Sequence, residues 1–211
     1  MKVIDDGVIK YDRSNFSLSG PLDALEYEEL EYWRNKLFKI GLIGEYPAEK
    51  IGFGNMSTVR DYSQFIKSIH PQFIITGTQT GKYSELSGSH YTRVLDYNIS
   101  ELKIKMMGCI EASSEALTHA AIYESNLKIK AVFHIHSSVI WKKMIEDKSD
   151  YTAAHIPYGT VEMAIATKKC ISDKNNGVFC MHGHVDGIVI YSESLELAGN
   201  MTLDLYDKYF K

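Results

Sequence analysis

Two histidines spaced two residues apart are the clearest candidates for chemistry in this chain. His134 and His136 lie in the apolar run 131–136, AVFHIH, whose composition predicts a buried strand. Alternate residues of a strand point to the same face, so the two imidazoles should project side by side while Ile135 points away. Neutral imidazole nitrogen suits zinc and similar ions, so the pair predicts part of a metal site. A histidine in a buried strand can also be purely structural, and the pair alone does not separate these interpretations.

The segment before this strand adds a carboxylate and two hydroxyl groups. Ser113, Ser114 and Glu115 open the helix-forming run 113–124, at positions typical of helix caps. Backbone N–H groups at a helix start point outward and favour an anion. We therefore expect these three residues at a helix start that packs near the strand, serving either as caps or as part of an anion site.

A second pair of histidines follows much later, in the segment 181–187, MHGHVDG. Either His182 or His184 could complete a three-histidine site with the first pair. Three protein ligands leave a coordination position open, which is typical of a catalytic metal. Glu115 would then stand near the open position as a general base. The alternative is that both late histidines are structural.

Two polar loops are candidates for binding an anion. The dipeptide Gly54-Asn55 suits a tight hairpin turn, or a loop whose N–H groups and amide hold an oxyanion. The run 77–81 is rich in glycine and threonine, so its N–H groups, with the hydroxyls of Thr78 and Thr80, could surround a phosphate. It lacks the spacing of a Walker A loop.

The remaining pattern predicts alternating helices and strands around these residues. The run 101–107 alternates apolar residues with lysines, as in a half-buried strand, and 98–100 should be the turn of a hairpin. The expected helices are 21–40, 137–147, a helix from about Thr160, and a last helix from Ser192. The expected strands are 73–76, 91–97, 101–107, 131–136, and a segment from Gly177 that is broken at Gly183 and Gly187.

Composition narrows the class of protein. The chain has 211 residues, a formal net charge of −4 and scattered basic residues, which argue against nucleic acid as a main partner. No apolar run is long enough to span a bilayer, and the first residues are too polar for a signal peptide. The three cysteines have no CxxC spacing, so we expect reduced thiols and a cytoplasmic protein.

The motifs described above, taken in their order along the chain, resemble those of the class II aldolase/adducin family. The resemblance runs from about Leu22 to Tyr206. The residues that carry it are Gly54-Asn55-Met56-Ser57, Thr80-Gly81, Ser113-Ser114-Glu115, His134-Ile135-His136, Tyr158-Gly159-Thr160 and the segment with His182 and His184. The resemblance implies a three-layer α/β/α fold with a mostly antiparallel central sheet.

The resemblance also implies roles for individual residues. It implies a Zn²⁺ ion held by His134, His136 and a third histidine. The third-histidine motif differs from the usual one, and we favour His184 over His182. It implies a phosphate held at the Gly-Asn, Thr-Gly and Ser-Ser positions, and it matches Glu115 to the aldolase acid/base. The phosphate-binding residues are then Gly54, Asn55, Thr80, Gly81, Ser113 and Ser114.

The activity implied is that of a metal-dependent aldolase, a lyase that cleaves a small phosphorylated ketose or related hydroxycarbonyl compound through a Zn-stabilised enediolate. The alternatives are a sugar-phosphate dehydratase or 4-epimerase of the same family, or a non-catalytic adducin-like oligomerising scaffold. The second acid/base residue stays open. We expect residues 1–20 to form an N-terminal arm, residues 21–211 to form the family domain, and the protein to be a homotetramer whose partner is a small sugar phosphate.

Overall fold

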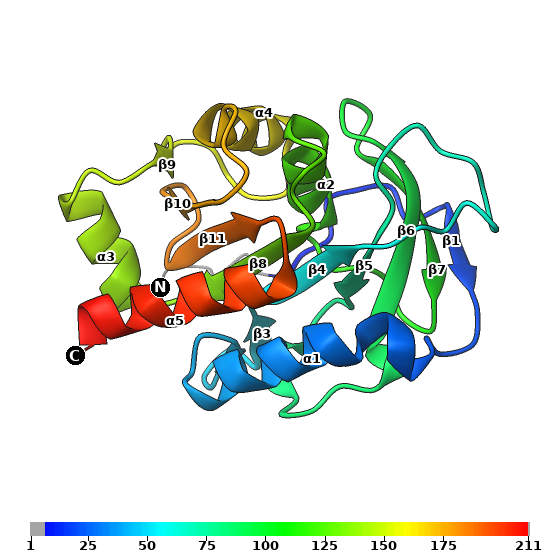
Figure 1. Cartoon of the computed structure of the whole chain (residues 1–211), viewed down its shortest axis with the longest axis horizontal. Helices are drawn as coiled ribbons and strands as arrows, with labels where there is room; N and C mark the ends of the chain where they lie inside the picture. The colour runs from blue at the N-terminus through cyan, green and yellow to red at the C-terminus, as the bar shows by residue number, and fades with distance from the viewer. Residues whose placement is uncertain (1–6, 211) are drawn as a thin grey trace.

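The structure is a computed structural model that describes residues 7–210, and its centre is a large twisted sheet (Figure 1). In this part of the chain the sheet has nine strands in the order β1-β7-β6-β5-β4-β8-β11-β10-β9. Only the two outermost pairs, β1 with β7 and β9 with β10, are parallel. The strands are β1 (Phe16–Leu18), β4 (Asn55–Val59), β5 (Phe73–Thr76), β6 (Tyr91–Asn98), β7 (Lys103–Gly108), β8 (Ala131–His136), β9 (Tyr151–Thr152), β10 (Gly177–Met181) and β11 (Gly187–Ser192), while β2 (Gly44–Tyr46) and β3 (Ile51–Phe53) form a separate hairpin.

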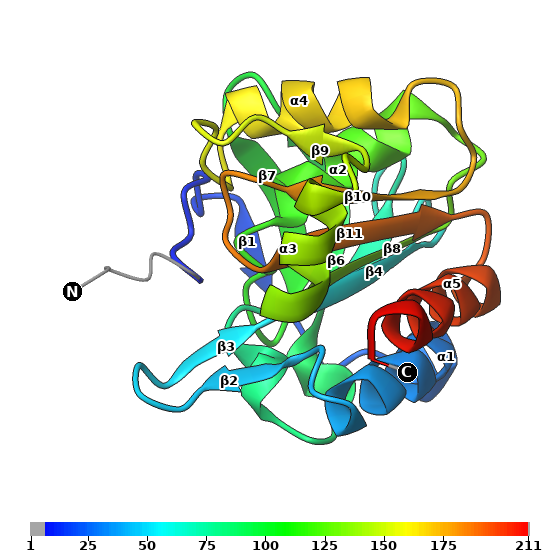
Figure 2. The same ribbon diagram turned by 90° about the vertical axis from the view of Figure 1, so that its left-hand side faces the viewer.

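Helices cover both faces of the sheet, which gives the three-layer fold that the resemblance implies (Figure 2). Helices α2 (Ala116–Ser125) and α4 (Val161–Ile171) pack together on one face. Helices α1 (Ala24–Lys39) and α5 (Leu195–Phe210) cover the other, with α3 (Ser138–Glu146) against α5. Among residues 7–210, no helix has the length and apolar character needed to cross a membrane.

The apolar side chains form one core on each side of the sheet, and β8 contributes to both. Val132 belongs to the core under α2 and α4, whereas Phe133 and Ile135 belong to the core under α1 and α5. Because side chains alternate along a strand, His134 and His136 lie on the same face as Val132. This alternation points both imidazoles toward the start of α2.

Most of the expected elements are present, and the differences concern the first third of the chain and the last helix. Gly54-Asn55 is not a hairpin turn: only Gly54 has a positive φ, of 79°, and Asn55 is the first residue of β4, paired with His134 of β8. The hairpin β2–β3 was not expected. The last helix begins at Leu195 rather than Ser192, which ends β11.

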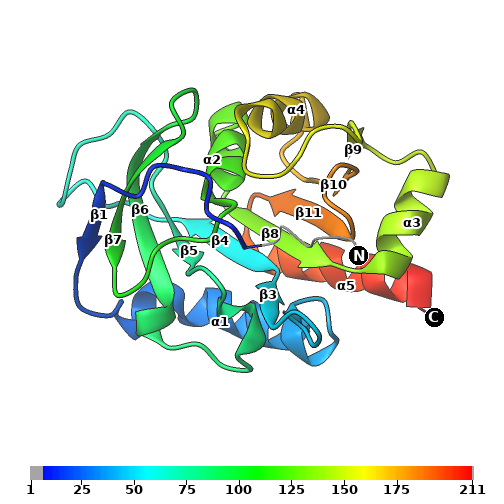
Figure 3. The ribbon, with the colours of Figure 1, turned by 180° about the vertical axis from the view of Figure 1, so that it is seen from behind.

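The N-terminal segment differs in part from the irregular arm expected for residues 1–20. Phe16–Leu18 form β1, which pairs in parallel with β7 at the sheet edge. Seen from behind, the chain before β1 crosses the start of α2 toward β4 and β8 (Figure 3). The prediction for residues 1–6 lies outside the described residues, and the domain boundary at residue 21 stays a prediction.

Candidate active site

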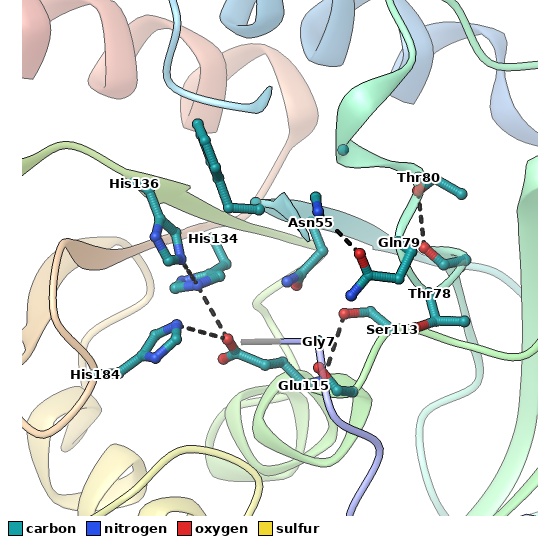
Figure 4. Close-up of a pocket in the computed structure, with 16 residues that line it drawn as sticks. Gly7, Asn55, Thr78, Gln79, Thr80, Ser113, Glu115, His134, His136 and His184 are labelled. Atoms are coloured by element: carbon teal, nitrogen blue, oxygen red, sulfur yellow. Dashed lines mark hydrogen bonds and ion pairs between the residues drawn. The ribbon is translucent and has the colours of Figure 1, made fainter. Parts of the chain in front are cut away.

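Three histidines from two strands and a turn converge on one point (Figure 4). His134 and His136 come from β8, and His184 comes from the turn between β10 and β11, where its N–H donates to Met181 O. The three are at most 5 % exposed, and one ring nitrogen of each lies within 4.8 Å of the others. The Nε2 atoms of His134 and His136 are 2.9 Å apart. Apposed nitrogens of this kind, buried together, are the arrangement that a metal ion stabilises.

A glycine makes room for the cluster. Gly187 is paired with His136 across the antiparallel ladder of β8 and β11. A Cβ atom at Gly187 would lie 2.5 Å from His184 Cδ2 and 2.9 Å from His134 Cε1. Any larger residue would therefore push the imidazoles apart.

His182, the other candidate for the third ligand, is not part of the cluster. Its ring packs edge-on against Trp141 and Tyr151, with centroids 5.7 Å from each. Gly183 separates the two histidines, and a Cβ there would collide with the backbone of Ile156. The tight turn thus directs His184 inward while His182 packs among aromatic rings.

Glu115 lies at the start of α2 but does not act as a cap. It occupies the N-cap position, and its side chain makes no hydrogen bond to the helix N–H groups. Its Oε1 lies 3.0 Å from His134 Nε2 and 3.3 Å from His184 Nε2, and the residue is 3 % exposed. Burial raises the pKa of this carboxyl, but the imidazoles of His134 and His184 outweigh burial and hold the pKa well below its usual range. The site therefore keeps an ionised carboxylate beside the three imidazoles.

Aromatic side chains that the sequence analysis did not single out hold the histidines in place. The Tyr46 hydroxyl is 2.7 Å from His136 Nδ1, and the Phe53 ring stacks on the same imidazole at 5.3 Å. With Nδ1 engaged by Tyr46, Nε2 of His136 is the nitrogen left to face the cluster. Tyr158 packs at 4.8 Å on His184, and its hydroxyl contacts the backbone of Val8.

A buried polar chain lies behind Glu115. His119 is one turn further along α2, fully buried, and its Nδ1 is 2.6 Å from Ser57 Oγ, which in turn contacts the Tyr123 hydroxyl at 2.7 Å. Burial lowers the pKa of His119 to about 3, against the smaller opposing effect of Glu115. His119 is therefore neutral at physiological pH. The sequence analysis did not single out His119, although its position four residues after Glu115 places both side chains on the same face of a helix.

A small cavity opens beside the cluster, and the residues proposed for phosphate binding line it. They are Gly54, Asn55, Thr80, Gly81, Ser113 and Ser114, together with Glu115 and the three histidines. Thr78, Gln79 and Gly7 line it as well, and the last two were not expected. The Thr80 hydroxyl donates to Gly77 O, so it stabilises the loop. Within the described residues, no lysine or arginine lines this cavity, which leaves hydroxyls, amides and backbone N–H groups as its donors.

The donor set fits a divalent metal ion. Three imidazole nitrogens and an adjacent carboxylate suit zinc and related first-row ions, whereas magnesium and calcium prefer oxygen ligands. The contact from Tyr46 to His136 is the kind of outer interaction that orients a metal-bound histidine. Burial lowers the pKa of His136 well below its ordinary value, assisted by the other two imidazoles, so this ring is neutral as a ligand must be.

Comparison with known proteins places the chain in a family. The model of the Class II Aldolase and Adducin N-terminal domain matches residues 42–205, so the chain belongs to this family, which includes aldolases, epimerases and decarboxylases. Members of the family use a divalent metal ion, in agreement with the buried histidine cluster. A search of curated proteins found no match.

Solved structures share the fold at low sequence identity. L-fuculose-1-phosphate aldolase from Thermus thermophilus superposes with a TM-score of 0.62 and 19% identity, over 88% of this chain and 91% of that one. YgbL from Escherichia coli, a putative aldolase/epimerase/decarboxylase, has a TM-score of 0.61 and 20% identity, over 85% and 84% of the two chains. An aldolase II superfamily protein from Pseudomonas syringae has a TM-score of 0.56 and 15% identity, over 89% and 74%. At these identities the likeness concerns the fold.

Proposed function

We propose that this protein is a metal-dependent aldolase that cleaves a small phosphorylated ketose or a related hydroxycarbonyl compound. The observation that carries the proposal is the convergence of Glu115 with His134, His136 and His184 at the wall of a donor-lined cavity. A bound Zn²⁺ or other divalent ion would supply Lewis-acid polarisation of the substrate oxygens and offset the negative charge of the enediolate.

Glu115 is the proton carrier in this proposal. Its ionised carboxylate accepts the proton that the substrate hydroxyl loses when the carbon–carbon bond breaks, and returns it to the carbon of the enediolate. Burial at 3 % exposure shields this proton from bulk water, and Oε2 has no hydrogen-bond partner among the described residues. One carboxylate oxygen is therefore available to the substrate while the other faces the imidazoles.

The phosphate of the substrate would bind among the other residues that line the cavity. Ser113, Ser114, Asn55 and the backbone at Thr80 and Gly81 supply neutral donors there. Backbone N–H groups that point into one concavity bind an anion without a cationic side chain. We further propose that the protein is a homotetramer, as the family resemblance implies.

A panel of sugar phosphates assayed on the metal-loaded protein tests the proposal. Release of an aldehyde identifies an aldolase, whereas loss of water or formation of an epimer identifies a dehydratase or epimerase of the same family. Metal analysis after gentle purification separates an enzyme from a scaffold, because a scaffold has no reason to retain stoichiometric zinc. The proposal would be overturned if the protein bound no metal and turned over none of the substrates.

A further inference from the structure

Gln79 has a strained backbone at the wall of the cavity. Its φ is 59°, in the left-handed region that costs a non-glycine residue free energy. Glycine would adopt this conformation freely, as it does elsewhere in the loops of this chain at Gly54 and Gly159. Strain of this kind persists where the surrounding structure enforces it, often at ligand sites. The presence of glutamine rather than glycine at position 79 therefore suggests a role for its side chain.

The side chain of Gln79 is oriented by one hydrogen bond. Its Oε1 accepts a hydrogen bond from the backbone N–H of Gly52 at 2.9 Å. This contact distinguishes the oxygen of the amide from its nitrogen. The NH₂ group is therefore the other end of the amide, and it points into the cavity toward Ser113 (Figure 4). It lies against Gly7, where a Cβ atom would collide with Nε2.

A second amide faces the same space. Asn55 is the first residue of β4 and is 8 % exposed. Its buried Oδ1 has no hydrogen-bond partner in the described structure. A buried polar atom without a partner costs free energy, so a ligand in the cavity would find this group unsatisfied. The Oδ1 of Asn55 is an acceptor and suits a hydroxyl of the ligand, whereas the NH₂ group of Gln79 is a donor and suits a phosphoryl oxygen.

We propose that Gln79 is a specificity-determining residue that donates a hydrogen bond to an oxygen of the substrate's phosphoryl group. The inference rests on the proposed function, because it assigns the phosphate to this cavity. An NH₂ group is a donor only, so it selects a phosphoryl oxygen over a group that must itself donate. In a cavity whose lining offers no lysine or arginine among the described residues, a hydrogen bond to the charged oxygen is one of the stronger contacts available.

The substitution Gln79→Gly tests this role without straining the backbone. Glycine accepts the φ of 59° and keeps the backbone N–H groups of the loop in place, but it removes the amide. Relief of strain and loss of the bond to Gly52 oppose each other, so the melting temperature should stay close to that of wild type. Affinity of the metal-loaded protein for inorganic phosphate, measured by titration calorimetry, should fall by about 10- to 100-fold.

Two further variants complete the test. Lys50 has the same φ of 59°, in the β2–β3 hairpin and outside the cavity, so Lys50→Gly relieves the same strain and should leave phosphate affinity unchanged. Gln79→Glu keeps the shape and the acceptor for Gly52 but replaces the donor by a negative charge, and should abolish phosphate binding.

The possible outcomes separate this inference from the proposed function. If Gln79→Gly binds phosphate as tightly as wild type while the loop stays folded, Gln79 does not contact the ligand and the inference is wrong. If the wild-type, metal-loaded protein binds neither inorganic phosphate nor 2-phosphoglycolate, the phosphate pocket itself is wrong, and the inference is overturned together with it.

Discussion

Replacing Glu115 by glutamine should slow turnover while leaving the site assembled. Glutamine has nearly the same shape as glutamate and keeps an oxygen at the position that faces His134 and His184. It cannot accept a proton. General acid–base catalysis contributes about 10²- to 10⁴-fold, so kcat should fall by that factor with metal content unchanged.

The structure also separates this role from that of a helix cap. Loss of an N-cap hydrogen bond costs about 1 kcal/mol, but the Glu115 side chain makes no such bond to α2. A change in stability, if it occurs, must come from the loss of charge beside the imidazoles. Rate and melting temperature should therefore be measured on the same metal-loaded samples, together with zinc content.

Glu111→Gln is the matched control. Glu111 precedes α2 on the same segment and pairs with Arg13 at 2.9 Å, outside the cavity. A partly exposed ion pair contributes at most about 1 kcal/mol, so this variant should turn over normally. A Glu115→Gln enzyme that melts earlier than wild type, yet turns over at the wild-type rate with full metal content, would remove Glu115 from the mechanism.

Three other predictions follow from the geometry, and a fourth follows from the family resemblance. His184→Ala should abolish tight zinc binding and activity, whereas His182→Ala should keep both; metal analysis showing the reverse would make His182 the third ligand. Tyr46→Phe removes the hydroxyl that contacts His136 Nδ1, and should weaken zinc affinity by about 10- to 100-fold in a chelator competition, with an unchanged affinity counting against the contact. The folded-state pKa of His119, about 3, lies below its unfolded value of 6.5, so its contribution to stability is present above pH 6.5 and is lost as the pH falls toward 3. Between pH 7 and pH 5, the free energy of unfolding of His119→Gln, measured in urea, should therefore decrease by about 2 kcal/mol less than that of wild type. An equal decrease in both proteins would refute the assignment. Light scattering at micromolar concentration should give a tetramer, and a clean monomer would contradict the proposed assembly.

Local patterns in the sequence predicted the strand and the helix start on which the site is built. The apolar alternation of 131–136 placed His134 and His136 on one face, and the structure has them there on β8. The serines and Glu115 lie at the start of α2 as expected. These predictions succeed because the period of a strand and the opening of a helix depend on residues that are adjacent in the chain.

Of the two interpretations of Gly54-Asn55, the hairpin turn was wrong, and for a different reason. The dipeptide is a typical turn signal, and the local chain offered no reason to reject a hairpin. The structure pairs Asn55 with His134, a partner far along the chain, so that β4 runs beside β8 in the middle of the sheet. A turn pattern cannot report a strand whose partner is distant, because long-range pairing outweighs local preference.

Tertiary structure alone brought the remaining parts of the site together. The motif MHGHVDG did not by itself separate His182 from His184, although the family resemblance favoured His184. In the structure, the tight turn between β10 and β11 directs His184 to the cluster while His182 packs on Trp141. Tyr46 and Gln79 carry no motif at all. Tyr46 reaches His136 from the β2–β3 hairpin, and Gln79 reaches the cavity from a left-handed position in the loop after β5. Sequence thus determined which side chains have the chemistry to bind a metal ion, whereas the register of distant strands decided which of them lie within contact distance of one another.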